Sequence, residues 1–258
     1  MLTDLELAYN ALKAKQDPYT TLWSYYDGDQ PLMYTARRLK ELFRNIEARF
    51  TENWCAVVVD TVMDRLNLGR FQVADNERAT DALNDLWLRT EMGLDSDDAH
   101  LAALVTGESY VIVWQEDGED LQAFYNDPRM CHIQYNPSNP REKLWGVKWW
   151  QEQDSSWRLT LYYPEELQYF YAKGPQLHSA KQFQQMPDPI ALNPFGKIPI
   201  FHLRPNRRIV KGELNASIID LQNAVNKLLS DMMVAAEFAA LPQRYVISQM
   251  EPGDLRNA

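Results

Sequence analysis

The longest regular pattern of apolar positions in this chain lies in residues 212–242. Apolar residues recur there at steps of three and four, which is the spacing of one face of an α-helix. The residues on this face are Ile218, Leu221, Val225, Leu228, Met232 and Ala236. Asn215 or Ser217 can cap the start, and Pro242 ends the pattern. At a rise of about 1.5 Å per residue, the helix is predicted to be a rod of roughly 35–40 Å.

This apolar face has two interpretations. It can pack on the domain that precedes it, as most such faces do. It can also contact another copy of the helix or another long helix, because methionine and alanine give its second half small and adaptable side chains on more than one side. Those residues are Met232, Met233, Ala235, Ala236, Ala239 and Ala240. The pattern alone leaves both interpretations open.

Helical spacing also predicts shorter helices in the first part of the chain. We expect them at 1–16, 35–50, 53–66, 76–90 and 94–106. Asp17 and Pro18 are predicted to end the first helix, with an aromatic loop following at 19–34. Residues 53–66 are apolar nearly all round, which predicts a buried helix at the floor of the core. A short strand is expected at 71–73.

After Gly107 the apolar period changes from that of a helix to that of a β-strand. Asp117 and Gly118 mark the turn of a hairpin. The expected strands are 109–115, 121–126, 130–136, 144–150, 156–163, 167–172 and 198–203. In residues 144–150, apolar side chains point to both sides of the strand, which predicts a sheet covered on both faces. Residues 173–197 are expected to be irregular. The predicted fold class is α+β, with a helical N-terminal part, a mostly antiparallel β-sheet and then the long α-helix.

Composition indicates a folded chain and limits its partners. Of 258 residues, 45% are hydrophobic and 12% are aromatic, as in globular proteins. The formal net charge is −10, whereas a protein that grips duplex DNA by its phosphates is normally basic. We therefore expect the protein either to contact nucleic acid without binding it tightly or to bind it only through a local patch. We expect no membrane-spanning segment and no secretory signal, and the two separated cysteines fit a reducing cytosol.

The sequence lacks the common catalytic motifs. It has no GxxxxGK[ST] phosphate-binding loop and no GxSxG nucleophile elbow. The best metal-like cluster is Asp95, Asp97, Asp98 and His100, and Asp97 shares a helix face with His100. Polar residues in a first helical turn are more often a cap and partners of the helix dipole. We predict no catalytic residue, no metal site and no cofactor, and a metal-dependent enzyme that uses this cluster is the alternative.

A basic cluster precedes the long helix. It consists of Arg204, Arg207, Arg208 and Lys211. It can be a solvated turn, a contact with an acidic protein, or a place where a nucleic-acid backbone passes. Because the rest of the chain is acidic, we favour a protein contact over a DNA contact.

The chain resembles portal proteins of tailed double-stranded DNA phages, of the siphophage type. The order of four stretches carries the resemblance. They are YYDGDQPL (25–32), NWCAVVVDTVMDRLNLGRFQV (53–73) followed by GESYVIVWQEDG (107–118), NPFGKIPIFHLRPNRR (193–208), and GELNASIIDLQNAVNKLLSDMMVAAEFAALPQRYVI (212–247).

The resemblance implies an N-terminal portion of a longer portal protein. Residues 1–210 would form the wing, with helices in 1–106 and a β-rich part in 107–204. Residues 211–242 would form the stem helix, and 243–258 would begin the clip. The family forms a ring at one capsid vertex, a dodecamer in the full-length form. Double-stranded DNA passes through it during packaging and ejection. The implied partners are terminase and the major capsid, scaffolding and head-completion proteins, and no membrane is involved. The protein would be assembled in the host cytoplasm and become part of the virion.

The residues that this resemblance assigns to a subunit interface or to the channel wall lie on the stem. They are Ile218, Asp220, Leu221, Val225, Lys227, Leu228, Asp231, Met232 and Glu237. The acids among them could face DNA or a neighbouring subunit, with Lys227 as a counter-charge. A second alternative is a monomeric adaptor that binds proteins through the aromatic loop at 19–34.

Overall fold

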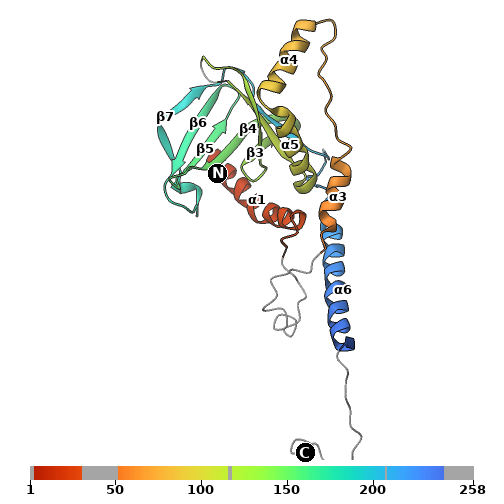
Figure 1. Ribbon diagram of the computed structural model, residues 1–258. Coiled ribbons are helices and arrows are strands. Elements are labelled where there is room, and N and C mark those ends of the chain that lie inside the picture. The colour runs from red at the N-terminus through yellow and green to blue at the C-terminus, as the bar shows by residue number, and fades with distance from the viewer. Residues whose placement is uncertain (1–2, 31–51, 116–117, 207, 241–258) are drawn as a thin grey trace, which may run out of the picture. The chain divides into compact units, whose positions relative to one another are not determined.

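The computed structural model describes residues 3–30, 52–115, 118–206 and 208–240 (Figure 1). The chain divides into two compact units, which are considered separately. The first is Met1–Gln30 with Asn53–Ile219, and the second is Pro31–Glu52 with Asp220–Ala258. The helix expected at 35–50 and the residues after 240 lie outside the described ranges.

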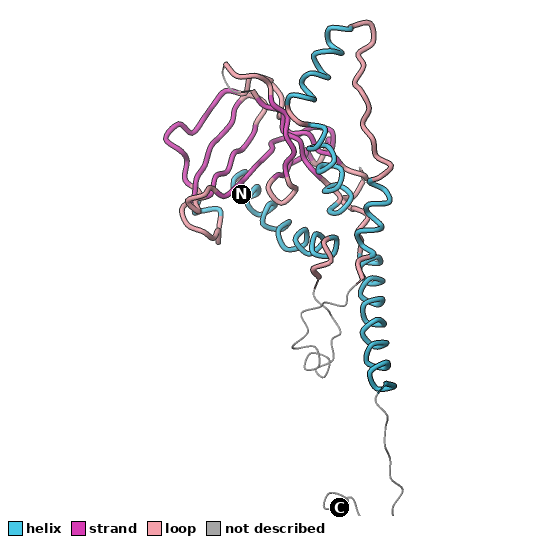
Figure 2. The backbone as a smooth tube through the Cα atoms, in the orientation of Figure 1, coloured by secondary structure: helices cyan, strands magenta, loops and turns pink. Residues whose placement is uncertain are grey.

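Helices and antiparallel strands occur together, which confirms the α+β class. The described helices are α1 (Asp4–Tyr26), α3 (Trp54–Met63), α4 (Glu77–Arg89), α5 (Met92–Thr106), the 3-10 turn η1 (Ala180–Gln182) and α6 (Ala216–Ala240). The strands are β1 (Ser109–Trp114), β2 (Gln122–Asn126), β3 (Cys131–Asn136), β4 (Asn139–Gln151), β5 (Trp157–Tyr162), β6 (Glu166–Ala172), β7 (Gln184–Leu192) and β8 (Ile200–Leu203). They form two sheets, ordered β2-β1-β8 and β3-β4-β5-β6-β7 (Figure 2).

The five-stranded sheet is covered on both faces, as its sequence predicted. On one face, Trp145, Val147 and Trp149 of β4 pack against Ala8 and Leu12 of α1. The other face packs against the three-stranded sheet. Gly146 allows this close approach, because a Cβ atom there would lie 2.7 Å from Cδ1 of Ile200. Helix α5 in turn packs on β1 and β2.

The prediction that Pro18 ends the first helix is wrong. Helix α1 continues through Pro18 to Tyr26, so the segment from residue 19 to 26 is helical instead of an aromatic loop. Proline removes one backbone hydrogen bond, but α1 buries side chains on both sides of it, such as Leu12 and Tyr25. Tertiary packing thus outweighs the local cost of the proline.

The prediction that residues 173–197 are irregular is also wrong, because they contain η1 and the nine-residue strand β7. Two prolines, Pro187 and Pro189, argued against a strand. They are tolerated because β7 is the edge strand and pairs only with β6, with a register shift in the ladder beside them.

Two further expectations need correction. The buried residues of helix α3 are Cys55 and Val59, whereas Val57 is 49% exposed. The helix is therefore buried on one face and not nearly all round. Residues 71–73 form no strand. Their backbone groups bond instead to side chains of α4: Asn84 accepts from the Phe71 N–H (3.1 Å) and Thr80 accepts from the Val73 N–H (2.9 Å).

Candidate functional site

Helix α6 is present as a continuous helix of 25 residues, and Asn215 is its cap. The Asn215 side chain accepts a hydrogen bond from the Ser217 backbone N–H (3.1 Å), which places Ser217 inside the helix. The start of α6 belongs to the first unit. There Ile218 packs against a core made by α1, α3 and α5, including Tyr25, Val59 and Leu104.

Beyond this start, most of the apolar face predicted for α6 is exposed, and Val225 is half-buried. Leu221 is 62% exposed, Leu228 is 62% exposed and Met232 is 67% exposed. Packing of this face on the preceding domain is observed at Ile218, within the first unit. Within the described part of the second unit, Leu221, Leu228 and Met232 are left largely uncovered.

The side of α6 that is buried within the second unit is polar. Gln222 and Asn226 are 2% and 4% exposed. The Gln222 side-chain amide donates to the Glu52 carbonyl (2.6 Å), and the Glu52 N–H donates to the Asn226 side chain (3.0 Å). Burying polar side chains while exposing leucines is the reverse of the usual pattern for a helix on its own domain.

The remaining predicted stem residues differ in their surroundings. Lys227 and Asp231 form an ion pair one helical turn apart. Asp220 is exposed and Val225 is half-buried. The side chain of Glu237 lies outside the described part of the chain.

Two glycines fix the segment that leads into α6. A Cβ atom on Gly212 would lie 2.3 Å from the Leu104 carbonyl oxygen, and one on Gly107 would lie 2.5 Å from the Lys211 nitrogen. Gly107 also has a φ of 95°, in the left-handed region that ends α5. The Glu213 N–H donates to the Leu104 carbonyl (2.6 Å). The C-terminal end of α5 is therefore the anchor for the start of the long helix.

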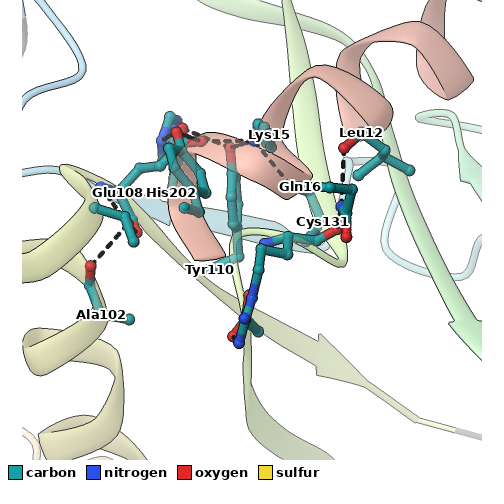
Figure 3. A network of polar contacts seen from close by, with 12 residues as sticks. Leu12, Lys15, Gln16, Ala102, Glu108, Tyr110, Cys131 and His202 are labelled. Carbon is teal, nitrogen blue, oxygen red and sulfur yellow. Dashed lines mark hydrogen bonds and ion pairs between the residues drawn. The ribbon is translucent and has the colours of Figure 1, made fainter. Parts of the chain in front are cut away.

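Beside this anchor lies a buried polar network centred on Glu108 (Figure 3). Its carboxylate lies 2.6 Å from Nζ of Lys15 on α1 and 2.9 Å from Nε2 of His202 on β8. The hydroxyls of Tyr19 and Tyr110 donate to it at 2.7 and 2.8 Å. The network joins α1, β1 and β8 at the residue that follows Gly107.

The charges of this network are set by opposing effects. Burial would raise the pKa of Glu108, but the hydrogen bond with His202 and the charge of Lys15 hold it well below its usual range. Burial lowers the pKa of Lys15 and of His202, against the attraction of Glu108. The carboxylate is 3% exposed, so it is not open to a substrate. Its contacts instead join α1, β1 and β8.

Sequence reasoning missed Lys15 and Glu108 as partners. The available signal was a glutamate at the start of an apolar strand, in the run GESYVIV. A charged residue at such a position needs a buried partner. Nothing in the sequence identifies which lysine supplies it.

The metal-like cluster is not gathered into one site. Asp95 accepts a hydrogen bond from the Tyr125 backbone N–H (2.7 Å) and so ties α5 to β2. Within the described ranges, no group of three His, Cys, Asp or Glu side chains is close enough to hold a metal ion. Among the helices that the structure describes, none is long and apolar enough to cross a membrane.

The basic cluster is spread over a loop. The Arg204 guanidinium lies 5.3 Å from the centre of the Tyr135 ring. Arg208 and Lys211 are exposed. Arg207 lies outside the described residues.

Comparison with protein families gives a match over nearly the whole chain. The family described as phage portal protein, SPP1 Gp6-like, matches residues 8–256. A search of proteins with curated functions gives no match.

Proposed function

We infer that this chain, which belongs to the SPP1 Gp6-like family of phage portal proteins, assembles with further copies of itself into the ring that conducts DNA at the capsid vertex. Membership gives a structural role at the portal of the phage capsid, in a family of structural proteins and not of enzymes. The architecture of the ring and its docking partners belong to the proposal.

The observation that carries the proposal is the exposed apolar face of α6. Leu221, Leu228 and Met232 project from one side of the helix, and each is more than 60% exposed. Burying one such side chain stabilises an assembly by about 1.5–3 kcal/mol. A contiguous apolar face on a soluble protein usually marks an interface. A neighbouring copy of α6 or of the wing supplies a surface to cover it.

In this proposal the chain divides into the wing (1–210), the stem (211–242) and the beginning of the clip (243–258). The stem lines the channel as one of the helices of a dodecamer. The clip docks terminase and later the head-completion proteins, and the wing faces the major capsid and scaffolding proteins. The ring is built in the host cytoplasm before it becomes part of the virion.

The acidic character of the chain supports passage of DNA. The chain has a net charge of −10, and a channel wall of like charge would repel the DNA phosphates instead of binding them. In this proposal the exposed Asp220 faces DNA or a neighbouring subunit, while Lys227 pairs with Asp231.

A substitution on the exposed stem face tests this role. In the intact protein, Leu228→Asp is expected to lower the fraction of protein in rings on the order of a hundredfold, because a buried unpaired carboxylate is costly at each of the repeated interfaces. The fraction is measured by light scattering after size exclusion. Circular dichroism and the thermal midpoint should stay unchanged, since Leu228 packs little within its own subunit.

Leu192→Asp is the matched control. Leu192 is 85% exposed at the end of β7, so the same change is made away from the stem. Rings of normal abundance are expected from this variant. Normal rings from Leu228→Asp would contradict the assignment of α6 to the subunit interface.

A further inference from the structure

The loop before α6 carries an exposed basic segment, here called the basic loop and defined as residues 208–211 (RIVK). Its last residue, Lys211, leads directly into the anchor at Gly212, which packs on the Leu104 carbonyl. The strand before it, β8, is held by His202 through Glu108 (2.9 Å). Side chains next to a fixed backbone lose less freedom when they bind a partner.

The two cations of the basic loop are available for a partner. Arg208 and Lys211 are exposed, and the described residues offer neither side chain an ion-pair partner. Arg204, by contrast, is stacked on the Tyr135 ring within the same subunit. The basic loop therefore presents two positive charges that no described residue of the same subunit neutralises, in a chain of net charge −10.

The residues between these cations favour a protein partner over DNA. Ile209 is 55% exposed and Val210 is 49% exposed. Protein interfaces combine an apolar centre with a charged rim. Contacts to a nucleic-acid backbone are made by cations and polar hydrogen-bond donors, which aliphatic side chains cannot replace.

A surface of complementary charge lies elsewhere on the first unit, in a cavity of about 390 Å³. We call it the acidic cavity. Its walls include the carboxylates of Asp27, Asp98 and Asp127 and the rings of Trp23 and Tyr125. Arg129 pairs with Asp127 at 2.7 Å, so the charged residues that line the cavity are three aspartates and one arginine. Carboxylates beside aromatic rings are the groups that hold a guanidinium, through paired hydrogen bonds and stacking.

We propose that the basic loop of one subunit docks on the acidic cavity of the next subunit in the ring, with the Arg208 side chain entering the cavity. This inference rests on the proposed ring. The two surfaces lie on different elements, the loop after β8 and the cavity formed by α1, α5 and the segment after β2. A contact between two unlike surfaces is head-to-tail, which is the kind that closes a ring. Ile209 and Val210 then lose water at the centre of the contact.

A charge swap in the intact protein tests the docking. Arg208→Asp and Asp98→Arg are each expected to lower the ring fraction on the order of tenfold, because each places like charges face to face. The double variant Arg208→Asp/Asp98→Arg restores the ring fraction to near the unmodified level. Lys173→Glu, an exposed charge reversal at the end of β6, is the control and should leave the fraction unchanged. Thermal unfolding verifies that each variant is folded, and Lys211→Asp replaces Arg208→Asp if that variant does not fold.

The outcomes separate this docking from its alternatives. Normal rings from both single variants would overturn it. Normal rings that bind or package DNA less well after Arg208→Asp would instead assign the basic loop to nucleic acid. Loss of rings without recovery in the double variant would overturn the pairing with Asp98. If the unmodified protein forms no rings, both this inference and the proposed function fail, whereas failure of the swap alone leaves the portal role intact.

Discussion

Replacement of Glu108 by glutamine is expected to lower the free energy of unfolding by about 3–5 kcal/mol. The change keeps the size of the side chain but removes the counter-charge of Lys15, whose side chain is only 11% exposed. A lysine left without its partner in the interior must stay charged at a high cost or lose its proton. Urea unfolding followed by tryptophan fluorescence measures the difference.

The cause of that loss is tested by a second substitution. Lys15→Met in the Glu108→Gln background removes both charges and should recover a large part of the stability, because a neutral pair costs less to bury than one isolated charge. Glu119→Gln, at an exposed glutamate, should change stability by less than about 0.5 kcal/mol. A Glu108→Gln protein as stable as the original would show that the network is not important for the fold.

The same carboxylate makes stability depend on pH. Its pKa in the folded protein lies below the unfolded value of about 4.3. The unfolded chain therefore binds a proton first as the pH falls, so the contribution of Glu108 is complete above this value and is lost progressively below it. In Glu108→Gln, the fall in stability between neutral pH and pH 3 should be correspondingly smaller.

The second large effect is expected from Gly212→Ala, which should cost about 3 kcal/mol or more of folding stability. The added Cβ would lie 2.3 Å from the Leu104 oxygen and 2.8 Å from the Val105 oxygen. Both are backbone atoms of α5, so they cannot rotate away. The residues leading into α6 would have to move off α5, and the Glu213 to Leu104 hydrogen bond would be lost. Denaturant unfolding and the ring fraction are the two measurements.

Gly69→Ala is the control for this substitution. No atom lies within 4 Å of a Cβ at Gly69, and stability should be unchanged or slightly higher. If Gly212→Ala were equally harmless, the tight junction between α5 and the start of α6 would be absent in solution.

The sequence predicted those helices and strands whose local pattern of apolar residues agrees with their tertiary packing. The hairpin of β1 and β2 follows a clear period of two. Helix α6 follows a period of 3.6 with Asn215 as its cap, and α4 begins at Glu77 with Asn76 as its cap, within one residue of the expected start. In these segments local propensity and tertiary packing favour the same structure.

The predicted secondary structure was wrong in segments where a proline lies inside a helix or strand that tertiary packing stabilises. Pro18 lies within α1 because the helix packs along its length. Strand β7 tolerates two prolines because, among the described strands, it lies at the edge of its sheet. Neither condition can be read from a local window, since both depend on distant partners. The same applies to the site: the apolar face of α6 was predicted, but its exposure was not. The pairing of Lys15 with Glu108 depends on how α1 crosses the sheets.

The mass of the particle formed by the intact protein shows whether the chain assembles into a ring. Light scattering after size exclusion, with negative-stain images viewed along the symmetry axis, gives the number of subunits and the presence of a central hole. We expect a closed ring of dodecameric mass with a hole at its centre. A monomer at every concentration would contradict it and leave the family's fold without the assembly proposed here.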